Sequence, residues 1–156
     1  MIIASAEQMR DLGRAIGSRV RSGDVIVLIG DLGAGKTTLV QGLAPALGVR
    51  DAITSPTFVI AREHRADGRT LQHVDAYRLA SPADFWDLDL DLASSVTVIE
   101  WGESLLDDLT DDPVLVVRID RDESTRRVTL SGSPVRWPPE TLDELMASVT
   151  DLSRSP

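Results

Sequence analysis

Residues 30–37 read Gly30-Asp31-Leu32-Gly33-Ala34-Gly35-Lys36-Thr37 and match the pattern G-x-x-x-x-G-K-[ST] at every fixed position. An apolar run at 24–29 (DVIVLI) precedes this loop, and residues 36–47 read as a helix that Gly48 ends. The glycines let the backbone wrap closely around phosphate oxygens, and the helix N-terminus adds free N–H groups. The stretch predicts a strand–loop–helix unit, a P-loop, that binds a nucleoside triphosphate, in the first place ATP.

The lysine of this loop is the only one in the chain, against fifteen arginines. A compact ammonium fits inside a phosphate loop, which is the one task that a guanidinium cannot easily take over. We therefore expect Lys36 to bridge the β- and γ-phosphates and the Thr37 hydroxyl to ligate Mg²⁺.

A second metal-binding group is expected at the end of a neighbouring buried strand. Residues 96–100 (VTVIE) supply four apolar or β-branched residues followed by an acid. Glu100 is the candidate to hold Mg²⁺, directly or through water, and to polarise the attacking water. The alternative is a surface glutamate at a strand end.

Residues 73–78 (HVDAYR) are the third element. Strand alternation places His73 and Asp75 on one face, where Asp75 can support the metal. A lone histidine such as His73 is more often structural, and two histidines without cysteine disfavour a zinc site. The loop Thr54-Ser55-Pro56-Thr57 can sense a γ-phosphate, but a simple proline turn explains the same spacing.

The whole chain of 156 residues reads as one α/β domain, with residues 132–156 adding no identified function. We expect a P-loop NTPase-type three-layer sandwich whose sheet is mainly parallel with antiparallel hairpin strands. Further helices are predicted at 5–21, 102–109 and 140–149, and another helix is predicted to start at 81–84. Further strands are predicted at 57–64, 70–76, 114–120 and 127–130. A hairpin turn is predicted at Ala66-Asp67-Gly68-Arg69.

Composition and charge narrow the class of protein. Hydrophobic residues make up 42% and charged residues 26%, no apolar run reaches a membrane span, and the start does not read as a signal peptide. A cytoplasmic location is the expectation.

The acidic residues are unevenly spread along the chain, whose net charge is −9. Residues 79–117 carry ten acids and no basic residue, which argues against direct nucleic-acid binding there. This stretch is either a solvated surface or a docking face for a basic partner.

Three classes of P-loop protein can be compared. Guanine-specific GTPases use an Asn-Lys-x-Asp motif, and this chain has no asparagine, which excludes that class. A small-molecule kinase stays open, since Arg62, Arg65 and Arg69 could form a lid. A switch module that controls a partner is the third possibility.

Four motifs together are more specific than the P-loop alone. GDLGAGKTTL at 30–39, SPTF at 55–58, HVDAYRL at 73–79 and IEWGE at 99–103 resemble the TsaE family, once called YjeE, over residues 5–130. The resemblance implies an ATPase with Mg²⁺ that works with TsaD-like and TsaB-like proteins in threonylcarbamoyl modification of adenosine beside the tRNA anticodon. Slow ATP hydrolysis would reset that complex, and tRNA would be reached only through the partners.

The resemblance also assigns residues to roles. It implies catalytic roles for Lys36, Glu100, Asp75 and Thr57, metal binding by Thr37, Glu100 and Asp75, and nucleotide binding by Asp31, Gly33, Ala34, Gly35, Lys36, Thr37, Thr38, Trp101 and Arg126. The family usually has a threonine near the adenine where this chain has Met9. A methionine can pack on an adenine face but cannot replace a hydroxyl hydrogen bond.

Overall fold

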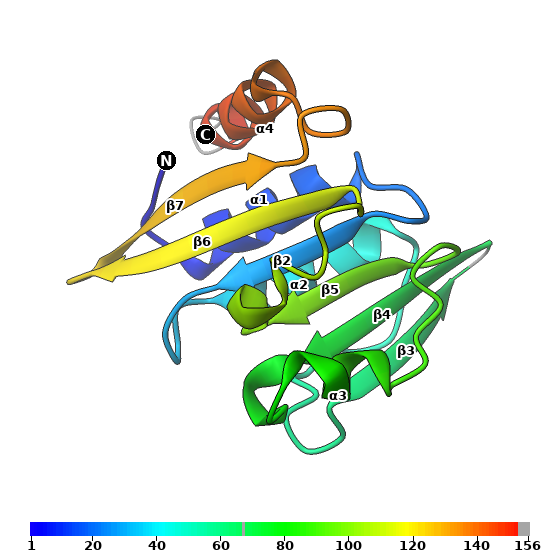
Figure 1. Cartoon of the computed structure of the whole chain (residues 1–156). Helices are drawn as coiled ribbons and strands as arrows, with labels where there is room; N and C mark the ends of the chain where they lie inside the picture. The colour runs from blue at the N-terminus through cyan, green and yellow to red at the C-terminus, as the bar shows by residue number, and fades with distance from the viewer. Residues whose placement is uncertain (67, 153–156) are drawn as a thin grey trace.

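The computed structural model describes residues 1–66 and 68–152, and within them seven strands form one mixed sheet in the order β1-β7-β6-β2-β5-β4-β3 (Figure 1). The four central strands are parallel, and antiparallel partners extend both edges. The strands are β1 (Ile2–Ile3), β2 (Val25–Ile29), β3 (Ala61–Ala66), β4 (Arg69–Asp75), β5 (Val96–Glu100), β6 (Val114–Asp122) and β7 (Thr125–Gly132). The expected α/β class, with its parallel sheet and antiparallel hairpins, is confirmed.

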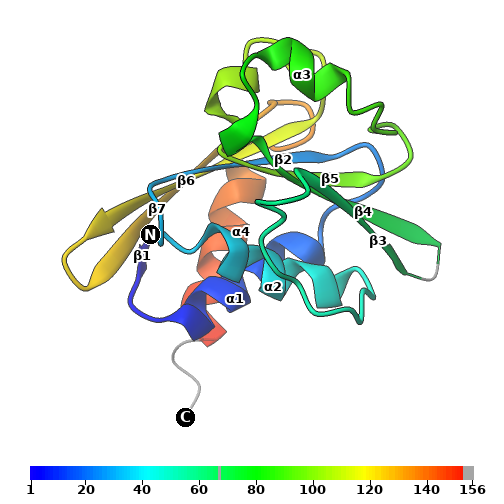
Figure 2. The same cartoon turned by 90° about the horizontal axis from the view of Figure 1, so that it is seen from below.

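The helices form a layer on each side of the sheet (Figure 2). One face carries the three long helices, α1 (Ala6–Gly17), α2 (Lys36–Ala46) and α4 (Pro139–Leu152). The other face carries the short α3 (Pro82–Trp86) with the 3₁₀ turns η1 (Ala76–Arg78) and η2 (Gly102–Leu105). Each layer buries its own apolar cluster against the sheet, so the three-layer arrangement is present.

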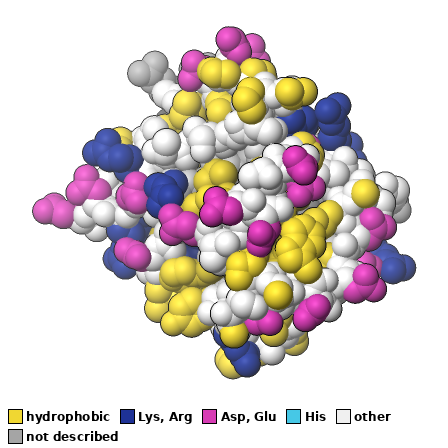
Figure 3. Space-filling view, in the orientation of Figure 1, with side chains coloured by type: hydrophobic (Ala, Val, Ile, Leu, Met, Phe, Trp, Pro, Cys, Tyr) yellow, Lys and Arg dark blue, Asp and Glu magenta, His cyan; other side chains and the backbone are white. Residues whose placement is uncertain are grey.

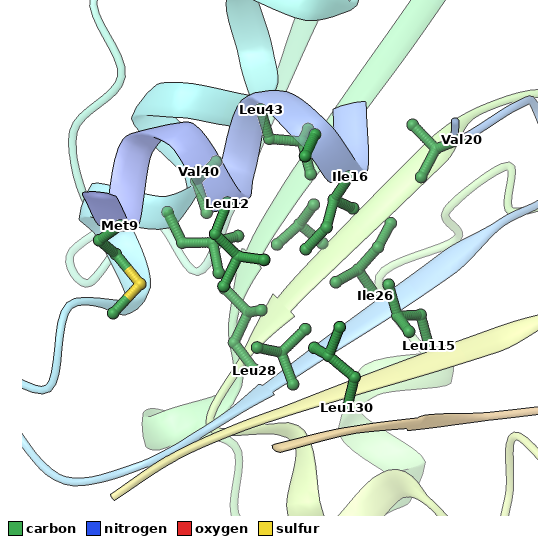
Figure 4. Close-up of a cluster of buried hydrophobic side chains, with 14 of the residues drawn as sticks. Met9, Leu12, Ile16, Val20, Ile26, Leu28, Val40, Leu43, Leu115 and Leu130 are labelled. Carbon is green, nitrogen blue, oxygen red and sulfur yellow. The ribbon is translucent and has the colours of Figure 1, made fainter. Parts of the chain in front are cut away.

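The central strand β2 is buried along its whole length because both of its faces are covered. Ile26 and Leu28 point toward α1 and α2, while Val25 and Val27 belong to the cluster on the opposite face (Figure 4). The predicted apolar stripe of α1 closes the first cluster, with Leu12 and Ile16 fully buried.

Two glycines allow α1 and α2 to touch backbone to backbone. A Cβ at Gly13 would lie 2.0 Å from the carbonyl oxygen of Leu39, and one at Gly42 would lie 2.0 Å from that of Arg10. Neither clash can be relieved by a side-chain movement, because the atoms met are backbone. This contact holds α2, and with it the glycine-rich loop at its start, in a defined place over the sheet.

The structure corrects several predicted boundaries. Residues 57–60 form a turn rather than the start of a strand, with the Val59 and Ile60 amides donating to Pro56 and with Ile60 at φ +67°. β3 therefore begins only at Ala61, because this backbone cannot continue a ladder.

Other differences are smaller. Helix α1 ends at Gly17 rather than at residue 21, and the predicted helix 102–109 is helical only over η2, before further turns. The Ala66–Arg69 pairing closes the predicted hairpin, although Asp67 of that turn lies outside the described residues. Strand β1 has no counterpart in the sequence prediction, because two residues carry no periodicity.

The segment after β7 is anchored by a buried ion pair. Asp24, at the start of β2, is 1% exposed and accepts hydrogen bonds from Arg136 at 2.9 and 2.6 Å. The guanidinium also donates to the Arg19 carbonyl and lies 4.1 Å from the Trp137 ring centroid. This pair links the turn before α4 to the strand that leads into the glycine-rich loop. No helix within 1–66 and 68–152 is long and apolar enough to span a membrane.

Replacing Arg136 with methionine is expected to lower the free energy of unfolding by about 2 kcal/mol, because the buried Asp24 carboxylate loses its charged partner and keeps only the N–H of Arg21. Urea denaturation measures this effect. The matched control is Arg127→Met, an exposed arginine on β7, for which we expect no change beyond about 0.5 kcal/mol. Equal midpoints for the two variants would contradict a stabilising role for the pair.

Candidate functional site

A cleft of about 450 Å³ opens where the carboxyl ends of β2, β4 and β5 meet the start of α2. In an open α/β sheet this end of the strands is the usual place for a ligand. Its lining is Leu32, Gly33, Gly35, Lys36, Thr37, Thr38, Ser55, Thr57, Asp75, Tyr77, Glu100 and Trp101. The cleft therefore collects residues from all four sequence motifs.

Lys36 is held at the centre of the loop. Its ammonium donates to the carbonyls of Gly30 at 2.6 Å and Asp31 at 2.9 Å, so the loop curls around it. Burial lowers the pKa of Lys36 below its usual value, while the nearby carboxylates of Glu100 and Asp75 act in the opposite direction. The arrangement presents a fixed, partly desolvated cation to the cleft.

Thr37 and Glu100 meet across the cleft from elements 63 residues apart. The Thr37 hydroxyl donates to Glu100 Oε1 at 2.9 Å and lies 3.2 Å from Oε2. Glu100 is only 3% exposed, since it ends a strand with neighbours on both sides. The strand-end glutamate predicted from sequence is thus no surface residue.

His73 approaches the same carboxylate from β4. Its Nε2 lies 2.8 Å from Glu100 Oε1, and the ring is fully buried. The sequence pointed to a hydrogen-bonded histidine here but did not identify its partner. The alternation of His73 and Asp75 on β4 was the available signal, because both face the end of β5.

Asp75 and the loop 54–57 form the opposite wall. The Thr57 hydroxyl donates to Asp75 Oδ2 at 2.9 Å, and the Ser55 hydroxyl lies 3.4 Å from the same oxygen. The backbone N–H of Tyr77 donates to Asp75 Oδ1 at 3.0 Å. The SPTF loop is therefore tied to the cleft rather than being only a proline turn.

Trp101 covers the lysine. Its backbone has φ +62°, a left-handed conformation that is uncommon for a bulky residue and that turns the chain out of β5. In this position the indole centroid lies 3.6 Å from Lys36 Nζ and 5.1 Å from the Tyr77 ring centroid. The aromatic pair shapes one rim of the cleft, and Tyr77 was quoted within its motif but was not predicted as a site residue.

A smaller cavity of about 170 Å³ lies on the other side of the glycine-rich loop, lined by Ile3, Ala4, Ser5, Ala6, Met9, Gly33, Ala34, Gly35, Thr38, Ser124 and Arg126. Arg126 donates to the carbonyls of Ala34 and Gly33 at 3.1 and 3.4 Å. Met9 offers this cavity apolar surface from α1. Arg126 and Ala34 thus border the smaller cavity rather than the main cleft.

Asp31 lies apart from both of these spaces. Its exposed side chain borders a groove of about 390 Å³ toward β6, and only its carbonyl reaches Lys36. Its contribution to a ligand in the cleft would therefore come through the backbone.

The donor set of the cleft suits a hard cation. No group of three His, Cys, Asp or Glu side chains that could hold a metal occurs among the described residues. The cleft instead offers the hydroxyl of Thr37 and the carboxylate of Glu100, with Asp75 nearby. Oxygen ligands of this kind, completed by phosphates and water, suit Mg²⁺.

The acidic stretch 79–117 is divided by the fold. Glu100 is buried in the cleft, and Glu103 pairs with Arg118 at 2.8 Å. The remaining acids lie in the segments 84–91 and 107–112, whose leucines pack in the cluster on the α3 side of the sheet. Figure 3, which views that side, shows acidic side chains across the middle of the face. Burial and the neighbouring Asp111 raise the pKa of Asp112. The acidic surface is thus smaller than the sequence suggests.

Comparisons with known proteins agree over most of the chain. The family model described as threonylcarbamoyl adenosine biosynthesis protein TsaE matches residues 3–129. The tRNA threonylcarbamoyladenosine biosynthesis protein TsaE of Streptomyces coelicolor is 51% identical over 139 residues, covering 83% of this chain and 93% of that protein. The protein of the same description from Treponema pallidum is 39% identical over 131 residues, covering 81% of this chain and 96% of that one.

A solved structure matches the fold as well. The crystal structure of YdiB from Bacillus subtilis superimposes with a TM-score of 0.71, covering 99% of this chain and 95% of that one. Sequence identity in this match is 22%, so the likeness concerns the arrangement of helices and strands.

Proposed function

The chain belongs to the threonylcarbamoyl adenosine biosynthesis protein TsaE family, and from this premise we propose that it is a Mg²⁺-dependent ATPase of tRNA threonylcarbamoyladenosine biosynthesis. In this proposal it acts with TsaD-like and TsaB-like partners, and slow ATP hydrolysis resets the complex they form. The cytoplasmic location expected from the sequence stays a prediction.

One observation carries the proposal: the Thr37 hydroxyl and the Glu100 carboxylate meet at 2.9 Å beside the buried ammonium of Lys36. The glycine-rich loop and the start of α2 would bind the phosphates through backbone N–H groups and Lys36. Thr37 and Glu100 would hold Mg²⁺, with Asp75 in support. When bound, Mg²⁺ would neutralise charge on the phosphate oxygens.

Three side chains of this protein would act directly in hydrolysis. Lys36 would stabilise negative charge that develops on the transferred phosphoryl group. Glu100 would orient the attacking water. Thr57, which is hydrogen-bonded to Asp75 in this structure, would sense the presence of the γ-phosphate. Trp101 and Tyr77 would limit the access of bulk water to the cleft.

The adenine base would lie on the side of the glycine-rich loop that faces away from the main cleft. The smaller cavity beside Gly33 and Ala34 offers the apolar surface of Met9 together with Arg126. This lining supports packing on a purine face rather than a side-chain hydroxyl contact from residue 9.

Contact with tRNA would be indirect in this proposal. Exposed acids, among them Asp87, Asp107 and Asp111, would repel a phosphate backbone, and the only lysine is committed to the nucleotide. A basic protein surface would instead be attracted to this face, and more strongly at low salt.

A small-molecule kinase is the alternative, and its expected lid finds no support. Arg62 Nη1 lies 3.4 Å from the Thr54 hydroxyl, and Arg65 pairs with Glu63 at 2.6 Å. No arginine of the described chain lines the cleft. Arg62 thus contacts the loop 54–57 and Arg65 contacts its own strand, and neither lines the cleft.

Phosphate release separates the two functions. We expect slow release that no small-molecule acceptor accelerates and that TsaD-like and TsaB-like proteins change, with Lys36→Ala protein as the blank in each arm. The isolated protein is expected to bind no tRNA at physiological salt. Acceptor-dependent formation of a phosphorylated metabolite, without any partner protein, would overturn the ATPase proposal in favour of a kinase.

A further inference from the structure

The buried histidine of β4 has a geometry that the proposed chemistry does not use. Parallel pairing of β4 with β5 sets His73 beside Val98 and Asp75 beside Glu100, so both β4 side chains share the face on which Glu100 lies. From this position His73 Nε2 reaches Glu100 Oε1 at 2.8 Å.

The surroundings of the second ring nitrogen indicate which nitrogen of His73 carries the proton. His73 Nδ1 is buried and has no hydrogen-bond partner within the described chain. An N–H at Nδ1 would be an orphaned donor, which folded proteins avoid more strictly than an orphaned acceptor. The arrangement therefore favours the tautomer with its proton on Nε2, donating to the carboxylate.

The hydrogen bond from His73 decides which oxygen of Glu100 is left available for Mg²⁺. Oε1 receives the short contacts, from His73 at 2.8 Å and from Thr37 at 2.9 Å, whereas the nearest described donor to Oε2 is Thr37 at 3.2 Å. A glutamate side chain has three rotatable bonds, and two short hydrogen bonds to one oxygen hold it in one rotamer. Oε2 then has only the longer contact to Thr37 and is the oxygen of Glu100 left for a cation.

We propose that His73 is a positioning residue, which holds the Glu100 carboxylate in the orientation that receives Mg²⁺. The role rests on the proposed function of this cleft, and it acts through Glu100 rather than by contact with the nucleotide. Partners of this kind, one step behind a metal ligand, typically change metal affinity or activity by about 10–100-fold when removed.

The test compares three variants. His73→Leu removes the donor while keeping a buried apolar side chain, and His73→Gln returns an amide N–H that can reach the place of Nε2. Gln72→Leu is the matched control, because Gln72 is a buried neighbour on the opposite face of β4. Urea denaturation of all three variants separates a general loss of stability from an effect on the site.

Calorimetry with ADP in Mg²⁺ and in EDTA gives the first readout. For His73→Leu we expect the affinity for ADP measured in EDTA to stay within about twofold of that of the unmodified protein. The increase in ADP affinity that Mg²⁺ brings should be about tenfold smaller. His73→Gln should recover most of that gain, and Gln72→Leu should keep it. A full gain in His73→Leu, with only a loss of stability, would reduce His73 to a structural residue.

Crystal structures of the nucleotide-free variants give a readout independent of activity. We expect the Glu100 carboxylate to leave Thr37 in His73→Leu and to return to it in His73→Gln. An unmoved Glu100 in His73→Leu would overturn the positioning role even if the protein is an ATPase. Conversely, a moved Glu100 in a protein that hydrolyses no ATP would keep the positioning role and reject the proposed function.

Discussion

Replacing Lys36 with alanine is expected to lower the rate of ATP hydrolysis by at least about 10³-fold and to weaken triphosphate binding. Lys36 is 5% exposed, and its ammonium is fixed by two loop carbonyls and lies against the Trp101 ring. No other cation of the described residues lines the cleft, so none can take its place there. Phosphate release measures the rate, and calorimetry measures the affinity.

A second variant isolates the geometry from the charge. Lys36→Arg keeps a cation, but its planar guanidinium is too large for the curl of the loop, so we expect a loss comparable with that of Lys36→Ala. Both proteins should unfold at urea concentrations close to that of the unmodified protein, which excludes misfolding as the cause. Unchanged turnover in Lys36→Ala would reject the phosphate-site assignment.

Replacing Glu100 with glutamine is expected to reduce hydrolysis by about 10²-fold or more while nucleotide still binds. The amide keeps the shape of the side chain but loses the charge that would hold Mg²⁺ and polarise water. The Thr37 contact can survive, because the amide oxygen still accepts a hydrogen bond. Single-turnover hydrolysis and ADP calorimetry measure the two properties separately.

Asp75→Asn is the matched comparison, since Asp75 lies opposite Glu100 in the β4–β5 register and also accepts from a threonine hydroxyl. We expect a smaller loss of hydrolysis for Asp75→Asn, because Asp75 holds the loop 54–57 and would support the metal rather than polarise the attacking water. A larger loss than that of Glu100→Gln would transfer the main metal role to Asp75.

Local signals predicted the strand–loop–helix unit well. The run 24–29, the glycines of the loop and the helix after Lys36 each depend on neighbours in sequence, and the structure shows all of them. The strand 96–100 was predicted for the same reason, since a continuous apolar run implies cover on both faces.

The segment 57–60 shows where local signals were insufficient. Thr57, Phe58, Val59 and Ile60 all have high strand propensity, yet they form a turn because Thr57 bonds to Asp75 and the chain folds back on Pro56. Phe58 is left 91% exposed, which propensity alone would not suggest.

The sequence by itself determined the glycine-rich loop, the place of its single lysine, the acid at the end of a buried strand and the α/β class, because these depend on short-range spacing and burial. Only the tertiary structure decided which groups meet. Thr37 reaches Glu100 across 63 residues and His73 reaches it across 27, as a consequence of strand order and register. These long-range pairings follow from how the whole chain buries its apolar faces, which no single window of sequence contains.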